Sequence, residues 1–213
     1  MTVPVTINSD EVAPDGDLTA PADARGVVVF AHGSGSSRFS PRNRAVARSL
    51  QDLRLATLLF DLLRPEEEID QRSMQYRFDL ELLTPRLISA VEQVRRHAST
   101  AGLPVGLFGA STGAAVALLV AARRPELVEA VVSRGGRPDM AGDELARVEA
   151  PTLLIVGERD EQVLALNQQA DAALRNSEIR TIGQATHLFE EPGALEQVTE
   201  YAGEWFARYL KPD

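Results

Sequence analysis

Short, continuous apolar runs alternate along the chain with longer segments in which apolar residues recur at helical spacing. The apolar runs lie at residues 27–30, 55–60, 105–108, 130–132 and 152–156, with residues 178–182 as a further candidate. Turn-forming residues bound each run, and uninterrupted runs of this length are typical of parallel strands buried on both faces. The pattern therefore predicts at least five core strands with helices between them.

Helix-start signals occur between these predicted strands. Ser40 followed by Pro41 suits an N-cap and a first helical residue, and Thr84 followed by Pro85 indicates the start of a second helix. Because parallel strands need crossover connections, the alternation predicts an α/β fold with a mostly parallel sheet flanked by helices on both faces. In such sheets, ligands bind beyond the carboxyl ends of the strands.

No internal repeat and no linker rich in proline or glycine divides the 213 residues, so we expect one domain over residues 1–213. The last predicted helix carries apolar residues at positions 195, 198, 202, 205 and 209 on one face. The glutamate-rich segment at residues 64–71 is the most polar stretch, and we expect it to be a solvated surface loop.

Composition and charge narrow the classes of function. Apolar residues make up 44% of the chain and charged residues 25%, as in ordinary globular proteins. The formal net charge of -9 is spread along the chain and disfavours nucleic acid as a partner. Residues 1–23 show neither the basic start nor the apolar core of a secretion signal, and no run of 18 apolar residues occurs, so we expect a cytoplasmic protein without a membrane partner. The absence of cysteine excludes disulfides, thiolate metal sites and a thiol nucleophile.

A candidate nucleophile lies between a predicted strand and a predicted helix. Residues 109–113 (GASTG) match the G-x-S-x-G motif and directly precede the apolar helix predicted at residues 114–122. A serine on such a sharp turn has a strained backbone, which small neighbours at Gly109 and Gly113 permit, and its hydroxyl is exposed above the sheet. Ser111 is therefore the predicted nucleophile.

A serine nucleophile needs an adjacent base, and His187 is the best candidate among the three histidines. It follows the candidate strand at residues 178–182 and precedes the last helix, so a loop at the carboxyl edge brings it over the sheet. His97 ends a helix that precedes the nucleophile strand, and we expect it to be exposed and structural. His32 belongs to a different loop.

A carboxylate is also required, to orient the base. Asp160 lies in the polar loop after a predicted core strand, and we expect it to accept the Nδ1 proton of His187 and turn Nε2 toward Ser111. The chain order Ser, Asp, His is one of the orders in which this set of catalytic residues occurs. Glu158 and Glu161 in the same loop are the alternatives for this carboxylate.

A glycine-rich loop at residues 32–38 (HGSGSSR) follows the first core strand. Its backbone amides suit the stabilisation of a developing oxyanion, and we predict that the N–H groups of Ser34 and Thr112 form the oxyanion hole. His32 is expected to brace the loop through hydrogen bonds. Neither G-x-G-x-x-G nor G-x-x-x-x-G-K-[ST] is present, so a nucleotide-binding loop is disfavoured.

With Ser111, Asp160 and His187 in this order, and His32 after the first strand, the chain resembles the α/β-hydrolase superfamily over about residues 25–210. More narrowly, it resembles the small dienelactone hydrolase-like hydrolases. The blocks that carry this resemblance are residues 31–38 (AHGSGSSR), 61–63 (DLL), 109–113 (GASTG) and 133–138 (SRGGRP). Dienelactone hydrolases have a cysteine nucleophile at the position of Ser111. The resemblance implies hydrolysis of small-molecule carboxylic esters through an acyl-serine intermediate, with neither a cofactor nor a metal.

The substrate side of the predicted site is open. Only about 18 residues separate the strand at 130–132 from the next one, which leaves no room for a lid domain and favours short acyl chains. Three arginines on nearby loops are candidates for binding a substrate carboxylate, with local acids such as Asp61 or Asp139 as alternative partners: Arg38, Arg134 and Arg137.

Other functions fit the same residues. An acyltransferase or a perhydrolase would use the same three catalytic side chains with a different acceptor. A non-catalytic binding protein on a hydrolase scaffold usually lacks one of the three, and all three are present here. The oligomeric state is not readable from the sequence.

Overall fold

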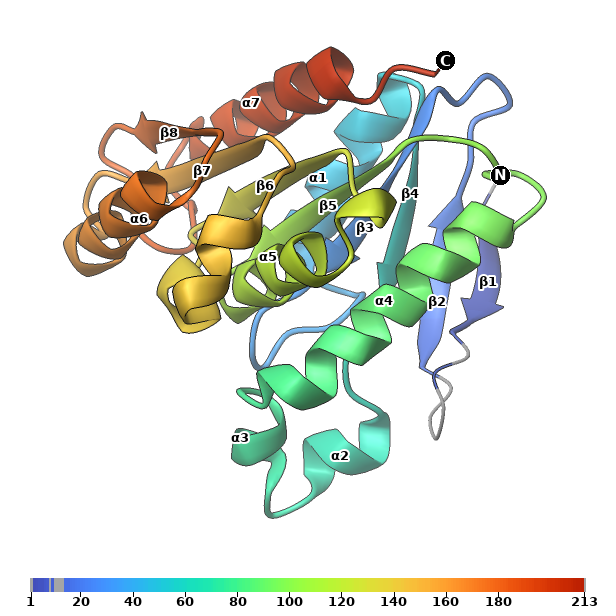
Figure 1. Cartoon of the computed structure of the whole chain (residues 1–213), viewed down its shortest axis with the longest axis horizontal. Coiled ribbons are helices and arrows are strands. Elements are labelled where there is room, and N and C mark those ends of the chain that lie inside the picture. The colour runs from blue at the N-terminus through green and yellow to red at the C-terminus, as the bar shows by residue number, and fades with distance from the viewer. Residues whose placement is uncertain (1, 8, 10–13, 213) are drawn as a thin grey trace.

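The computed structural model describes residues 2–7, 9 and 14–212, and its centre is an eight-stranded sheet. In space the strands follow the order β1-β2-β4-β3-β5-β6-β7-β8, and β3 to β8 run parallel to one another (Figure 1). The strands are β1 (Thr2–Thr6), β2 (Asp15–Thr19), β3 (Gly26–Ala31), β4 (Leu55–Phe60), β5 (Val105–Ala110), β6 (Ala130–Arg134), β7 (Thr152–Gly157) and β8 (Ser177–Ile182). All six strands predicted from apolar runs are therefore present.

Helices connect the parallel strands, as crossover connections require. They are α1 (Pro41–Asp52), α2 (Pro65–Ile69), α3 (Ser73–Tyr76), α4 (Leu80–Arg96), α5 (Thr112–Arg123), η1 (Pro125–Leu127), η2 (Pro138–Arg147), α6 (Glu161–Ala173) and α7 (Ala194–Tyr209). The helices labelled η are 3₁₀ helices. The predicted mostly parallel α/β fold is confirmed.

Successive side chains on the strands point into two apolar layers, one on each face of the sheet. On β3, Val27 and Val29 pack in the layer that α4, α5, η2 and α6 cover, whereas Val28 and Phe30 pack in the layer under α1 and α7. Figure 1 shows these two groups of helices on opposite sides of the sheet. Burial on both faces explains why the strand sequences are continuously apolar.

Two strands lie outside the sequence prediction. β1 and β2 pair antiparallel with each other, and β2 also pairs antiparallel with β4, so they extend the sheet at one edge. No residue of β1 is buried, and Pro4 lies within it. Proline is tolerated in an edge strand because its missing N–H is not needed for a second ladder. The two valines of β1 are separated by Pro4, so this short edge strand has no continuous apolar run by which the sequence could reveal it.

The start of α4 corrects a sequence prediction. The helix begins at Leu80, where Asp79 caps it by accepting a hydrogen bond from the Leu82 N–H at 3.0 Å, and Pro85 lies inside it. The Thr84–Pro85 pair is therefore not the helix start. Only five helical residues precede Pro85, so its missing N–H removes a bond close to the helix end, where the cost is smallest.

The segment at residues 64–71 also differs from the prediction of a solvated surface loop. It contains α2, which lies with α3 beyond the carboxyl end of β4 (Figure 1). Glu67 of α2 forms two 2.7 Å hydrogen bonds to Arg86, whose side chain is buried. Burial disfavours the charged form, but the bonds and charge of Arg86 lower the pKa of Glu67 overall. This ion pair fixes α2 to α4.

Between β6 and β7 the chain forms only the 3₁₀ helix η2, so no lid domain is inserted there, as predicted. In the described part of the chain, no helix is long and apolar enough to span a membrane.

Candidate active site

Ser111 lies at the carboxyl end of β5 and directly before α5. Its φ of 50° and ψ of -123° fall in a region that residues other than glycine rarely adopt. The backbone is held there by its neighbours: the Ser111 N–H donates to the Arg134 carbonyl at 3.2 Å, and its carbonyl accepts from the Arg137 N–H at 3.1 Å. The turn thus has the strained geometry expected of a nucleophile elbow.

Two glycines allow this turn. A Cβ at Gly109 would lie 2.4 Å from Cα of Ala114, and one at Gly113 would lie 2.2 Å from the carbonyl oxygen of Ala31. Any larger residue at either position would force α5 away from the strands. The requirement for small residues around the serine, predicted from the motif, is confirmed by these contacts.

His187 lies in the loop between β8 and α7, and Asp160 caps the start of α6. Nδ1 of His187 and Oδ2 of Asp160 are 2.6 Å apart. The two carboxylates considered as alternatives lie elsewhere: Glu158 accepts from the Gln184 N–H at 2.9 Å, and Glu161 is exposed in the first turn of α6. Asp160 is therefore the carboxylate that contacts the histidine.

The turn after β6 links the serine to the histidine. The carbonyl of Arg134, the last residue of β6, accepts the Ser111 N–H, and a Cβ at the next residue, Gly135, would lie 3.5 Å from Cε1 of His187. Ser111 and His187 therefore contact the same turn. They do not form a hydrogen bond with each other in the described structure, as is common for catalytic pairs before substrate binds.

The glycine-rich loop after β3 lies against the nucleophile. A Cβ at Gly33 would approach Cβ of Ser111 to 3.0 Å. The backbone N–H groups of Ser34 and Thr112 have no hydrogen-bond partner within the described residues, and both residues line the same pocket. Thr112 is the first residue of α5, where a helix leaves its N–H unpaired. These are suitable donors for an oxyanion.

His32 braces the loop, as predicted. Its Nε2 accepts the Leu62 N–H at 2.9 Å, so Nδ1 carries the proton and donates it to the Gly33 carbonyl, also at 2.9 Å. Burial lowers the pKa of His32, against the raising effects of the Gly33 hydrogen bond and of the charges of Asp61 and Glu68. The ring is therefore neutral, and it ties the oxyanion loop to the end of β4.

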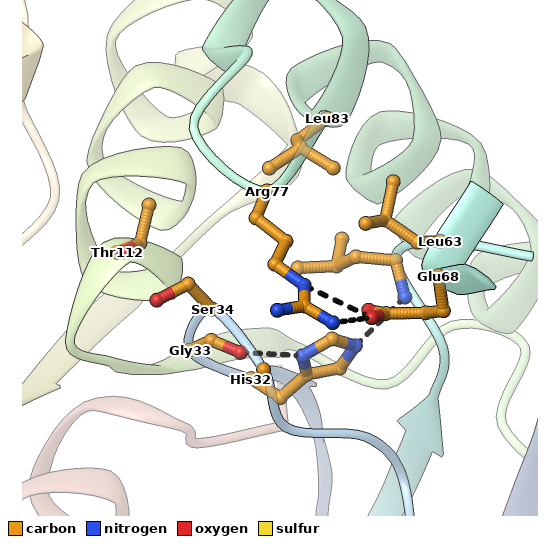
Figure 2. Close-up of a pocket in the computed structure, with 10 residues that line it drawn as sticks. His32, Gly33, Ser34, Leu63, Glu68, Arg77, Leu83 and Thr112 are labelled. Carbon is orange, nitrogen blue, oxygen red and sulfur yellow. Dashed lines mark hydrogen bonds and ion pairs between the residues drawn. The ribbon is translucent and has the colours of Figure 1, made fainter. Parts of the chain in front are cut away.

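A pocket opens beside the two candidate oxyanion donors (Figure 2). It contains about 220 Å³ of empty space, part of it open to solvent, and Leu62, Leu63 and Leu83 form its apolar wall. Arg77 and Glu68 also line this pocket, and Arg77 donates to Glu68 with Nε at 2.9 Å from Oε2. The sequence pattern did not predict this pocket, and it favoured a solvated loop for residues 64–71, which contain Glu68. The signal that could have revealed the pocket is the position of this segment beyond the carboxyl end of a core strand, where such sheets bind ligands.

The three arginines proposed as substrate ligands have different environments. Arg38 binds Asp61 through both its backbone N–H, at 2.7 Å, and its guanidinium. Arg137 binds Asp139 through two 2.8 Å hydrogen bonds. Both therefore pair with the local acids considered as alternatives. Arg134 is different, because it is buried and has no carboxylate partner within the described residues.

Among the described residues, no group of three histidine, aspartate or glutamate side chains is arranged to hold a metal ion. The groups gathered at the carboxyl edge of the sheet are instead three side chains, a hydroxyl, an imidazole and a carboxylate, together with free backbone amides. This set can carry out proton transfer and nucleophilic attack.

Comparisons with known proteins agree with this architecture. The family model described as "Alpha/beta hydrolase domain" matches residues 24–202. A solved dienelactone hydrolase from Anabaena variabilis is 52% identical, with a TM-score of 0.96 and 99% of each chain covered. Est1E from Butyrivibrio proteoclasticus shares the fold, with a TM-score of 0.82 over 96% of this chain and 98% of its own, at 16% identity.

Two Mycobacterium tuberculosis proteins, from strains CDC 1551 and H37Rv, are 55% identical over 207 residues and carry the name "Putative phosphoribosyl transferase". The match covers 97% of this chain and 46% of theirs, so the chain spans about half the length of these curated relatives. The family model covers most of this chain, residues 24–202, and the Anabaena structure covers 99% of it. The chain therefore belongs to the α/β-hydrolase superfamily, as a dienelactone hydrolase-like member.

Proposed function

We propose that this protein is a serine hydrolase that cleaves small carboxylic esters through an acyl-serine intermediate. The observation that carries the proposal is the arrangement of Ser111 on a strained elbow beside the turn that contacts His187, with Asp160 at 2.6 Å from the imidazole Nδ1. The dienelactone hydrolase from Anabaena variabilis, 52% identical to this chain, supports ester cleavage as the reaction class. The serine replaces the cysteine of dienelactone hydrolases as the nucleophile.

In the proposed reaction, Oγ of Ser111 attacks the ester carbonyl carbon while its proton passes to Nε2 of His187. The carbonyl oxygen becomes an oxyanion that accepts hydrogen bonds from the N–H groups of Ser34 and Thr112. The intermediate then breaks its bond to the alcohol, which leaves with the proton from His187. Water attacks the acyl-serine, gives its proton to His187, and the acid departs as Ser111 regains a proton. Asp160 stabilises the imidazolium in both halves.

The pocket beside the oxyanion donors is suited to the acyl chain. Its wall of three leucines is apolar, and its space is small and partly open to solvent. The Arg77–Glu68 ion pair lies beside Leu63 and Leu83 in the same pocket (Figure 2). We therefore expect short acyl chains to be the substrates.

The name of the mycobacterial relatives, phosphoribosyl transferase, refers to proteins of which this chain matches 46%. The family model that matches residues 24–202 of this chain is an α/β-hydrolase domain, which favours hydrolysis for this segment.

Labelling with a fluorophosphonate tests the proposal, because this reagent modifies only a serine activated by its neighbours. We expect one modified residue, Ser111, identified by peptide mapping, and Ser111→Ala to lose both labelling and p-nitrophenyl acetate hydrolysis. Loss of a catalytic triad residue typically costs several orders of magnitude in turnover. Ser99→Ala, a change of an exposed serine in the connection before the amino end of β5, is the matched control and should retain both.

Labelling of another residue, or an active and unlabelled Ser111→Ala protein, would contradict the assignment. Product analysis separates hydrolysis from acyl transfer. With water as the acceptor, the free acid appears in a one-to-one ratio to the alcohol, whereas an acyltransferase or a perhydrolase forms a new ester or a peracid when its acceptor is supplied.

A further inference from the structure

Arg134 is a buried cation whose hydrogen-bonding groups are poorly satisfied. The residue is 8% exposed, and its Nε and Nη1 have no hydrogen-bond partner within the described residues. Its Nη2 makes one long contact, 3.4 Å, to Oδ1 of Asn43. Burial, and to a smaller extent the nearby charge of Arg42, lower the pKa of Arg134 to about 10. The side chain is therefore still positively charged at neutral pH.

The surroundings of this guanidinium are also electropositive. Asn43 and Arg42 lie in the first turn of α1, a helix of 12 residues whose first turn contains no acidic residue. The amino end of a helix carries partial positive charge and favours anions. One carboxylate is nearby, that of Glu190, but it pairs with Arg42 at 3.1 Å and is 65% exposed. Within the described residues, two guanidinium groups and the amino end of α1 thus lie together, and the acid that pairs with one of them, Glu190, is mostly exposed.

This cluster is connected to the candidate active site. The Arg134 carbonyl accepts the Ser111 N–H at 3.2 Å. Its guanidinium lies 5.9 Å from the ring centroid of Phe189, two residues after His187, and Phe189 has an unusual positive φ of 56°. A ligand on Arg134 would therefore touch the elements that carry both the nucleophile and the base.

We propose that Arg134 and the first turn of α1 form a binding site for a small anion, which is either a free ion or an anionic group of the substrate. An isolated buried charge is costly, and an apolar residue at such a position is often neutral or stabilising. An anion in contact with Arg134 would supply the acceptors that its Nε and Nη1 lack. The site itself stands independently of ester hydrolysis, and only the substrate-borne source rests on the proposed function.

Thermal unfolding with inorganic phosphate as the probe tests the site without any need for activity. In HEPES buffer, added phosphate should raise the Tm of the wild type by at least about 3 °C, and that of Arg134→Met by less than about 1 °C. The matched control is Arg48→Gln, which removes the same charge from an exposed position of α1 and should respond as the wild type does.

A second variant places a carboxylate in the site. Asn43→Asp should raise the Tm in the absence of phosphate and abolish the response to it, because the new carboxylate satisfies Arg134. In the Arg134→Met background the new carboxylate interacts favourably only with the helix N-terminus, so Asn43→Asp should raise the Tm by a smaller amount. Equal rises in both backgrounds, together with an equal phosphate response of wild type and Arg134→Met, would overturn the proposal.

Rates then identify the source of the anion. If the substrate supplies it, the ratio of kcat/KM for monoethyl succinate to that for ethyl pentanoate should fall at least about tenfold in Arg134→Met, as expected for loss of a charge-assisted hydrogen bond. If a free ion occupies the site, the ratio stays constant while the phosphate dependence of Tm is lost. A protein that cleaves no ester but still shows the Tm difference would refute the proposed function and leave the anion site supported.

Discussion

Nδ1 of His187 and Oδ2 of Asp160 are 2.6 Å apart, although 26 residues separate them in sequence and Glu158 and Glu161 lie within two residues of the aspartate. The contact arises because both residues leave the carboxyl ends of adjacent parallel strands, β7 and β8. It holds the imidazole in the tautomer that leaves Nε2 free to accept a proton.

The first prediction concerns this pair. Asp160→Asn should lower kcat for p-nitrophenyl acetate by at least about 10²-fold, because an amide cannot fix the tautomer or stabilise the imidazolium. In the best-studied triad the same change costs roughly 10⁴-fold. Steady-state kinetics on protein whose fold is verified by circular dichroism provides the measurement.

Glu158→Gln and Glu161→Gln are the matched controls, since each removes one carboxylate from the same loop. Each should cost less than about tenfold. If either control proved more damaging than Asp160→Asn, the orienting carboxylate would have to be reassigned.

The second prediction concerns the pH dependence of stability. Burial lowers the pKa of His32 in the folded state below its ordinary value of 6.5, so below that pH the unfolded chain binds a proton that the folded chain does not. The free energy of unfolding should therefore fall as the pH falls below about 6.5, with a limiting slope of about 1.4 kcal/mol per pH unit from this residue.

Urea unfolding between pH 7 and pH 5 measures this slope. His32→Gln should be less stable at pH 7, because it loses the bridge between Gly33 and Leu62, but its stability should fall less steeply with acid. His97→Gln, which changes a histidine at the end of α4, should keep the wild-type slope. A His32→Gln slope as steep as that of the wild type would show that other groups cause the acid sensitivity.

The third prediction concerns the attachment of α2. Glu67→Gln should destabilise the fold by at least about 2 kcal/mol, because it leaves the buried charge of Arg86 without its carboxylate. Chemical denaturation gives the value. Glu66→Gln, a change of an exposed residue in the same short helix, should lie within about 0.5 kcal/mol of the wild type. Equal stability of the two variants would mean that the pair does not hold α2.

The parallel sheet and its connections could be predicted because buried positions require apolar or small residues. Strands such as β5 and β7 are apolar on both faces, and the GASTG elbow needs glycines at two positions that pack against backbone atoms. These requirements are local and leave clear patterns. The partner of His187 was predictable for a related reason, since parallel strands that end at one edge bring their loops together.

The features that the sequence did not reveal depend on long-range pairing. Glu67 has the sequence context of a solvated acid, and only the fold brings Arg86 to it. The edge strand β1 is half exposed and contains a proline, so its pairing with β2 leaves no apolar signal. The start of α4 was misplaced because Pro85 suits a first helical position equally well, and the cap at Asp79 decides the boundary. In each case a partner distant in sequence, or a competing local signal, determines the outcome.

The last prediction concerns the acyl pocket. Its small, leucine-walled space predicts that kcat/KM falls between butyrate and laurate esters of p-nitrophenol. Leu83 contributes one wall from α4 and is 3% exposed, so Leu83→Ala removes three carbon atoms that border the pocket. The shortened side chain should raise the ratio of kcat/KM for octanoate to that for butyrate at least about fivefold, because each added methylene of the acyl chain can then be buried, which contributes about 0.8 kcal/mol.

Leu87→Ala is the matched control. Leu87 is buried one turn further along α4 and is not part of the pocket, so its replacement should lower the stability by a similar amount, about 2–5 kcal/mol, without changing the ratio. A wild-type rate that rises steadily with chain length, or an equal change of the ratio in both variants, would show that the acyl chain binds elsewhere.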